Sequence, residues 1–118
     1  LDIVILGARY GDGKNGNVFS SFDMGVISDG GFTNVGSVGS GFTDNELIMM
    51  TNKLKPLTTN YNNGTYELLP RVVLTVTADL VSKNKDNTYG LRFPRMKKVR
   101  DDKPVTEINT IDDVAVLV

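Results

Sequence analysis

The sequence of 118 residues predicts an all-β domain with one main helix, built as a five-stranded Greek-key barrel with a short C-terminal helical tail. Two observations lead to this fold class. Short β-branched segments alternate with turns rich in Gly and Asn, which is typical of small barrels and sandwiches. Between the third and fourth of these segments, the apolar residues change once to a helical period.

The first three strands are predicted in the N-terminal part of the chain. Residues 2–10 form a β-branched apolar run that stops at the turn-rich residues 11–17. Residues 17–28 resume the extended pattern and end at residues 29–31, Asp-Gly-Gly, a sequence typical of a hairpin turn. Residues 32–39 alternate in character and predict the third strand.

The helix is predicted over residues 43–54. Thr43 precedes it and Glu46 follows three positions later, which is the pattern of a capping box. Pro56 ends the run. The apolar residues at helical spacing are Leu47, Ile48, Met50 and Leu54.

Two further strands are predicted in the second half. Residues 56–70 lack a clear pattern, and we expect an irregular segment there with residues 60–66 as an exposed loop. Residues 71–81 are the strongest strand of the chain, and a turn-rich loop separates them from a last strand over 91–100.

The end of the chain carries two local signals. Pro94 predicts extended backbone just before it, as at the start of a strand. Thr110 is placed to cap a short segment whose Asp112 and Asp113 favour a helical first turn. Three strands, a helix and two strands is the element order of an OB-fold, so we expect one OB-fold domain over residues 1–118.

Composition excludes several kinds of chemistry. The chain has no cysteine and no histidine, so disulfides, thiolate metal sites and Ser-His or Cys-His nucleophiles are impossible. No apolar run is long enough for a membrane span, and the first residues show no secretory leader. We therefore expect an intracellular protein without a membrane partner, and the start at Leu1 indicates a piece of something longer.

Positive charge is concentrated in residues 92–103, where six of twelve residues are basic although the formal net charge of the chain is −1. One interpretation is a solvated edge strand, and the other is recognition of polyphosphate or nucleic acid. Strand alternation places charge on both faces. One face would carry Met96, Lys98 and Arg100, and the other Arg95, Lys97 and Val99.

The two adjacent aspartates of this segment are not expected to bind a metal, because neighbouring side chains point in different directions. We expect Asp101 and Asp102 to hold Arg100 and Lys103 in fixed directions, so that these cations meet a phosphate in a preset geometry.

Residues 11–16 match the pattern G-x-G-x-x-G of dinucleotide sites. A strand rather than a helix is predicted after them, so this reading fails and a hairpin loop is expected. Lys14 at the loop tip remains a candidate contact to DNA phosphates.

Residues 91–104, LRFPRMKKVRDDKP, closely resemble the last nucleotidyltransferase motif of ATP-dependent DNA ligases, in which Arg-Phe-Pro-Arg leads to R-x-D-K. The resemblance extends over nearly the whole chain in the right order. It is carried by DIVILGARYGDGKNG at 2–16, VGSVGSGFTDNELIMM at 35–50, PRVVLTV at 70–76 and TIDDVAVLV at 110–118.

The resemblance implies that the OB domain closes over ATP bound to a separate adenylation domain, and later turns to hold DNA near a nick. It implies that Arg100 and Lys103 contact the ATP phosphates, that Asp102 orients these cations and that Arg95 assists them. Contacts to DNA are implied for Lys14, Arg92, Arg95 and Lys98.

The same resemblance implies the partners. These are nicked duplex DNA, ATP, and the adenylation domain of the same polypeptide, with ATP and Mg²⁺ as cofactors of the parent enzyme and none bound by the isolated domain. The chain lacks the Lys-x-Asp-Gly nucleophile, so we expect an inactive, monomeric module of an enzyme of replication, repair and recombination. Its expected location is an archaeal or viral-host cytoplasm, or a nucleus.

The chain departs from the family pattern at four places. Thr75 stands at a commonly acidic position, Lys97 at an apolar one, and Asn15 where a second basic residue is usual. The tryptophan often found ahead of the strand at 71–81 is missing.

Two other functions are compatible with the fold. A free-standing single-strand-binding module would need exposed aromatic residues, but most of Tyr10, Phe19, Phe22 and Phe93 fall at strand positions that a barrel core would claim. The OB domain of an RNA-capping guanylyltransferase shares the nucleotidyl-transfer chemistry, and the matches at 1–16 and 36–50 favour a ligase.

Overall fold

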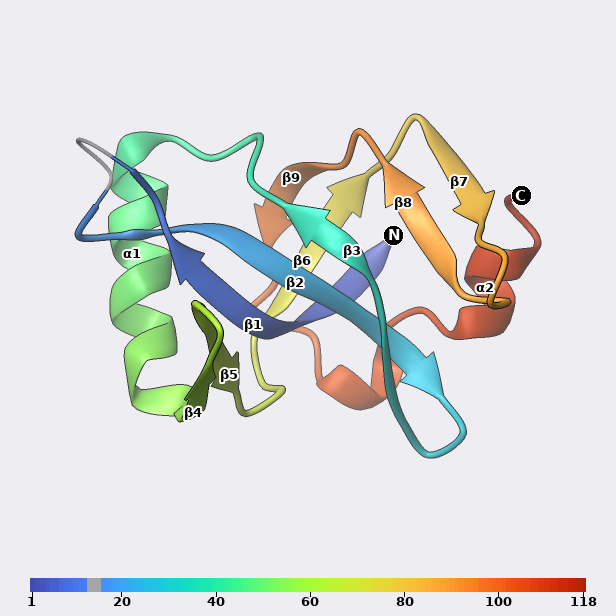
Figure 1. Cartoon of the computed structure of the whole chain (residues 1–118), viewed down its shortest axis with the longest axis horizontal. Coiled ribbons are helices and arrows are strands. Elements are labelled where there is room, and N and C mark those ends of the chain that lie inside the picture. Colours follow the sequence, from blue (N-terminus) through green and yellow to red (C-terminus); the bar gives the residue numbers. More distant parts are fainter. Residues whose placement is uncertain (13–15) are drawn as a thin grey trace.

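The first strand is the centre of the sheet in the computed structural model, which describes residues 1–12 and 16–118 (Figure 1). The strands of these residues are β1 (Asp2–Tyr10), β2 (Phe19–Ser28), β3 (Gly31–Val38), β4 (Thr58–Asn62), β5 (Thr65–Leu68), β6 (Val73–Thr77), β7 (Leu80–Lys83), β8 (Tyr89–Arg92) and β9 (Arg95–Val99). The helices are α1 (Asp44–Leu54) and α2 (Ile111–Ala115), with 3-10 turns η2 (Lys55–Leu57) and η3 (Val105–Glu107).

All strand pairs are antiparallel. One edge of β1 pairs with β2, which pairs in turn with β3. The other edge of β1 is divided between β6, opposite its N-terminal half, and β5, opposite its C-terminal half. β9 lies beside β6, so the five predicted strands appear as β1, β2, β3, β6 and β9 in the order β3-β2-β1-β6-β9.

The segment after β3 is joined to β9 through a close backbone approach. Met96 N donates a hydrogen bond to Ser40 O at 2.8 Å. Gly41 makes this possible, because its φ is +91° and a Cβ atom there would lie 2.3 Å from the carbonyl oxygen of Met96. The glycine therefore fixes how near the start of β9 comes to the end of β3.

The predicted β2–β3 hairpin is confirmed. Ser28 pairs with Gly31, and the two residues between them have positive φ, 47° at Asp29 and 80° at Gly30. This is the backbone of a two-residue type I′ turn, whose twist matches that of the flanking strands.

The prediction of an irregular segment over 56–70 is wrong. β4 and β5 form a hairpin whose turn is Asn63-Gly64, again with positive φ at both residues. Every residue of β4 is exposed, so no buried alternation marked the strand in the sequence. The Asn-Gly pair was the signal that could have found it.

The two C-terminal strands are each shorter than predicted. The strand predicted over 71–81 ends at Thr77, and β7 then leaves to pair with β8 in a separate hairpin. Because β8 pairs with β7 and β9 pairs with β6, the chain turns sharply between them. Phe93 makes this turn with a φ of 54°, so the extended backbone predicted before Pro94 is also wrong.

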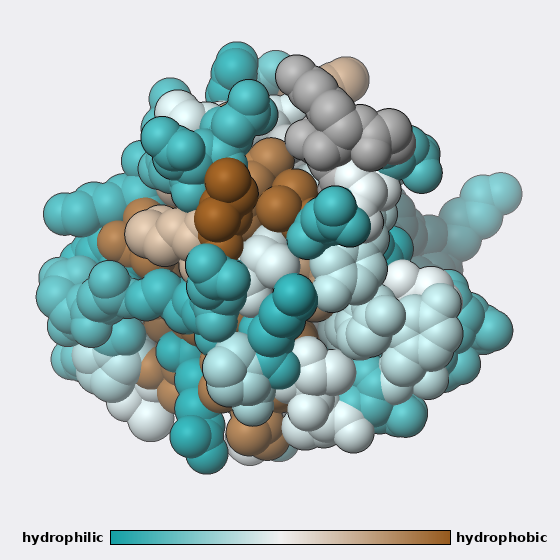
Figure 2. All heavy atoms as spheres, turned by 90° about the vertical axis from the view of Figure 1, so that its left-hand side faces the viewer, coloured by the Kyte–Doolittle hydropathy of each residue, from teal (hydrophilic) through white to brown (hydrophobic). Residues whose placement is uncertain are grey.

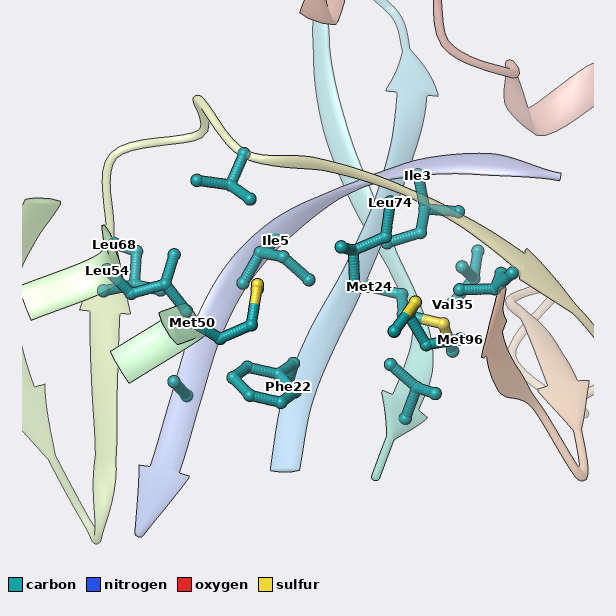
Figure 3. Close-up of a cluster of buried hydrophobic side chains, with 14 of the residues drawn as sticks. Ile3, Ile5, Phe22, Met24, Val35, Met50, Leu54, Leu68, Leu74 and Met96 are labelled. Carbon is teal, nitrogen blue, oxygen red and sulfur yellow. The ribbon is translucent and has the colours of Figure 1, made fainter. Parts of the chain in front are cut away.

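The main core lies between the sheet and α1 (Figure 3). The predicted capping box of α1 is present, with Thr43 and Glu46 exchanging hydrogen bonds at 3.1 and 2.9 Å. Thr51 ties the helix to the sheet, because its hydroxyl accepts from Phe19 N at 2.8 Å and donates to Leu47 O at 2.8 Å. The labelled core residues are Ile3, Ile5, Phe22, Met24, Val35, Met50, Leu54, Leu68, Leu74 and Met96.

A second, smaller cluster lies on the opposite face of β1. Val4, Val73 and Ile108 are buried together there, beneath the segment that contains η3. Asn109 holds this segment in place through a bridge of backbone hydrogen bonds to β1 and β2. The predicted tail helix follows as α2, with Thr110 as its cap.

α1 stands at one end of the molecule, and the β7–β8 hairpin with α2 lies at the other (Figure 1). Figure 2 shows the face on the α1 side, which is mostly polar with a small apolar area at its centre. Ile48 and Met49 are the exposed large apolar residues of α1, at 50% and 42%. No helix in residues 1–12 and 16–118 has the length and apolar character needed to cross a membrane.

Candidate phosphate-binding site

The basic segment 92–103 falls into three structural parts. Arg92 ends β8, residues 95–99 form β9, and residues 100–103 form a turn after it. These parts face different surroundings, so the six cations do not form a single patch.

A bulge in β9 changes the predicted faces. Thr75 of β6 lies opposite Lys98 and Val76 lies opposite Met96, so Lys97 is left unpaired. Met96 and Val99 consequently both point toward the main core, whereas strict alternation had placed them on opposite faces. Lys97 and Lys98 are both exposed.

Arg100 follows β9 on the outer face of β6. Its guanidinium makes a paired contact with Asp102, from Nε to Oδ1 at 3.0 Å and from Nη2 to Oδ2 at 3.1 Å. Nη1 donates to Thr75 Oγ1 at 3.3 Å. Asp102 therefore fixes the plane of the guanidinium, the arrangement expected for these two residues.

Lys103 is held by a residue that the sequence analysis did not single out. Its Nζ donates to Oδ2 of Asp2 at 2.5 Å, across 101 positions of sequence. The other oxygen of Asp2 accepts from Thr75 Oγ1 at 2.5 Å and lies 3.7 Å from Arg100 Nη1. Asp2 thus bridges the two cations of the motif.

In this cluster, the pKa values of two carboxyl groups, those of Asp102 and Asp2, are both lowered. The hydrogen bonds from Arg100 lower the pKa of Asp102 to about 2 and raise that of the guanidinium. Burial by itself would raise the pKa of Asp2. Hydrogen bonds from Lys103 and Thr75, with the nearby charge of Arg100, outweigh it and hold that pKa below its ordinary value.

Asp101 does not hold Arg100 or Lys103, contrary to the expectation for both aspartates. It points away from the motif and accepts a hydrogen bond from Lys53 Nζ of α1 at 2.5 Å. This contact ties the turn to the helix. The sequence could not distinguish the two aspartates, because their partners lie on different elements.

The expected DNA-contacting cations face outward where the structure describes them. Arg95 lies opposite Thr77 and Lys98 opposite Thr75, both on the exposed side of the β6–β9 pair. Arg92 is exposed at the end of β8, where its Nε donates to Ser82 Oγ at 3.0 Å. Lys14 lies outside the described residues.

Phe93 is the most exposed aromatic residue of the described chain, with 73% of its surface accessible. A positive φ at a bulky residue is unusual and points to a local constraint. Phe19 and Phe22 are buried, as expected, but Phe93 is exposed and stands in the sequence between the exposed Arg92 and Arg95. Phe93 also lines a pocket together with Ser40, Asp79, Pro94 and Arg95.

Arg100, Asp102 and Lys103, the RxDK cluster, have the properties of a phosphate clamp. The side chains of Arg100 and Lys103 are each 26% exposed, so both are supported by the protein and still accessible. Lys103 Nζ carries three hydrogens and gives one to Asp2, and no acceptor in residues 1–12 and 16–118 takes the others. Donors held in this way suit an anion with several oxygens.

Comparison with known proteins assigns a family to this arrangement. The model of the family described as "ATP dependent DNA ligase C terminal region" matches residues 15–103, which include the RxDK cluster. The chain belongs to this family. The resemblance stated from the motifs is thereby confirmed.

Relatives in archaea carry the same domain. A DNA ligase of Thermococcus fumicolans is 39% identical over 121 residues, covering 99% of this chain and 22% of that protein. A DNA ligase of Archaeoglobus fulgidus is 35% identical over 118 residues, covering 97% of this chain and 21% of that protein. The chain therefore spans about a fifth of the length of these ligases.

Solved structures agree on the fold. The ligase domain of LigD from M. tuberculosis superposes with a TM-score of 0.77 at 26% identity, covering 91% of this chain and 37% of that one. A mycobacterial DNA ligase D complexed with ATP and MES gives a TM-score of 0.72 at 24% identity, covering 92% of this chain and 36% of that one. The predicted fold, that of the ligase OB domain, is confirmed.

Proposed function

We propose that this ligase domain assists the transfer of AMP from ATP to an adenylation domain of the same polypeptide, and then holds duplex DNA around the nick. The observation that carries the proposal is the cluster in which Asp102 and Asp2 hold Arg100 and Lys103 side by side. Two supported cations with unused donors match the oxygens of a polyphosphate.

The chemistry needs such a clamp when pyrophosphate departs. A lysine nitrogen of the adenylation domain attacks the α-phosphorus of ATP, and the bond from phosphorus to the bridging oxygen breaks. Pyrophosphate leaves with the electron pair of that bond. Arg100 and Lys103 would donate to its oxygens and stabilise the charge that develops there, while Asp102 keeps the guanidinium in the required plane.

In this proposal, the adenylation domain provides most of the site for ATP and Mg²⁺. When bound, Mg²⁺ neutralises phosphate charge. Residues 1–12 and 16–118 contain no group of three or more carboxylates arranged to hold a metal ion, so the contribution of the described residues is the cations. The Arg95 side chain, exposed on β9, would assist at the same phosphates.

The outward-facing cations would serve the DNA. Arg92, Arg95 and Lys98 are exposed, and exposed cations of this kind bind the phosphates of a duplex without regard to sequence. Phe93 stands in the sequence between two of them, and apolar residues in this setting suit the minor groove. Lys14, which lies outside the described residues, completes the proposed set.

The setting follows from the same proposal. The domain would work as a monomer inside the cell, in replication, repair and recombination, and it would be inactive without its adenylation domain. The lack of a Lys-x-Asp-Gly sequence in the chain supports the last point.

Protein–AMP formation tests the proposal directly. The chain is fused to the adenylation domain of the Thermococcus fumicolans ligase, in place of the matching region of that protein. Arg100→Ala and Lys103→Ala should each slow AMP transfer from labelled ATP by about 100-fold, the usual cost of removing a donor from a site of developing charge. Lys97→Ala removes an exposed charge from the bulge of the same strand and serves as the matched control.

We expect the control to behave as the wild-type fusion does. Equal rates for all variants, or an equal loss in the control, would show that the motif does not act on ATP.

A further inference from the structure

We infer that Asp2 is a positioning residue of this site, because its carboxylate holds the Lys103 ammonium beside the Arg100 guanidinium. The inference rests on the proposed function, which assigns the two cations to ATP, and adds the group that sets their separation. Asp2 lies at the start of β1, far in sequence from the motif that identifies the family.

The carboxylate of Asp2 divides its oxygens between the two cations. Oδ2 accepts from Lys103 Nζ at 2.5 Å, and Oδ1 lies 3.7 Å from Arg100 Nη1. Asp102, by contrast, contacts only Arg100 of this pair. Asp2 is therefore the one carboxylate of the described residues that touches both cations.

Asp2 is itself held firmly. Its backbone N donates to Asn109 Oδ1 at 2.7 Å, and its carbonyl accepts from Asn109 N at 3.1 Å. Thr75 Oγ1 donates to its carboxylate from the neighbouring strand. Only 15% of the side chain is exposed, so the carboxylate has one well-defined position.

Such an anchor is needed because two positive charges lie close together. Lysine has a flexible four-carbon stem, and without a counter-charge Lys103 would move away from Arg100 into solvent. A carboxylate between them removes this repulsion and limits the loss of side-chain entropy when the phosphates bind. A displacement of about 1 Å at such a site costs up to about 100-fold in rate.

Thr75 supports the same interpretation. Its neutral hydroxyl donates to the Asp2 carboxylate and accepts from Arg100 Nη1. With no carboxylate at Thr75, the bridging charge of this cluster comes from Asp2.

The test measures two steps of the fused ligase for Asp2→Asn. We expect kcat for protein–AMP formation to fall about tenfold with the KM for ATP nearly unchanged, because the cations are misplaced rather than removed. Sealing of a nick that already carries AMP bypasses ATP and should keep its rate. Asp2→Glu keeps the charge and should recover part of the loss.

Asp23→Asn is the matched control. Asp23 also accepts from an arginine on the outer face of the sheet, Arg9 Nη2 at 2.8 Å, and its side chain is 17% exposed. Asp23→Asn removes a similar ion pair that lies away from the motif. Both steps should proceed at the wild-type rate.

A double substitution shows whether Asp2 acts through Lys103. In a Lys103→Met background, Asp2→Asn should cause little further loss. The same tenfold loss in both backgrounds, or an equal loss in nick sealing, would overturn the inference. If Asp2→Asn does not fold, Asp2→Glu takes its place, and a smaller loss of the same kind is expected, again without further loss in the Lys103→Met background.

The outcomes separate the two proposals. No effect of Lys103→Met refutes the proposed function. A loss with Lys103→Met but none with Asp2→Asn refutes only the positioning role of Asp2.

Discussion

The acidity of Asp102 comes mainly from one neighbour. Its ordinary pKa of 3.8 falls to about 2 because the Arg100 guanidinium donates to both carboxylate oxygens. NMR titration of the wild-type carboxyl should give a value near 2, and Arg100→Gln should return it toward 3.8. An unchanged value in the variant would mean that Arg100 does not hold Asp102 in solution.

This shift also predicts a pH window for stability. A carboxyl group whose pKa is lowered by folding stabilises the protein above its ordinary pKa, and the contribution disappears as the pH falls through the folded value. The Arg100–Asp102 contact should therefore be complete above about pH 4 and lost near pH 2. Urea unfolding of wild type and Asp102→Asn should differ at neutral pH and converge in acid.

Among individual residues, the sequence pointed to Arg100, Asp102 and Lys103 through their short motif, and the structure brings them together. Asp2 was missed because its partners are 98 and 101 positions away. The order of strands held the signal, since an OB-fold pairs its first strand with its fourth. A charged residue at the start of that first strand was a candidate neighbour.

The approach of β9 to the end of β3 depends on one glycine. Gly41→Ala should lower the free energy of unfolding by about 3 kcal/mol or more, since it combines a left-handed residue with a forced contact. The added Cβ would lie 2.3 Å from the Met96 carbonyl oxygen. Chemical denaturation measures the change.

Gly64→Ala separates the two causes. Gly64 has a φ of +86° but nothing within 4 Å of an added Cβ, so only the backbone cost of about 1–2 kcal/mol applies. Equal losses for the two variants would contradict the close packing at Gly41.

Elements that contribute several buried residues to the core were predicted well, and the wholly exposed one was not. β1, β2, β3 and α1 all carry buried core residues. β4 has none, so its hairpin was taken for a loop. The bulge at Lys97 could not be predicted from the sequence pattern either. Which residue is left unpaired depends on the register with the partner strand β6 and not on the neighbours of Lys97 in the chain.

The whole domain is slightly acidic, with a formal net charge of −1, so the proposed DNA binding would depend on where its cations lie. In the fused ligase, Arg92→Ala and Lys98→Ala should each reduce the slope of log affinity against log salt by about 1, as expected for one lost phosphate contact. Lys55, beyond α1, gives a matched control. An unchanged slope for Arg92→Ala and Lys98→Ala would exclude these two cations as contacts to DNA.

In the proposed function, two sets of cations perform different tasks. The most direct measurement compares protein–AMP formation with the sealing of a pre-adenylated nick in the same fused ligase. Arg100→Ala and Lys103→Ala should slow the first step far more than the second, and Arg92→Ala with Lys98→Ala should do the reverse. A uniform loss of both steps in both sets of variants would show that the two sets of cations do not perform different tasks.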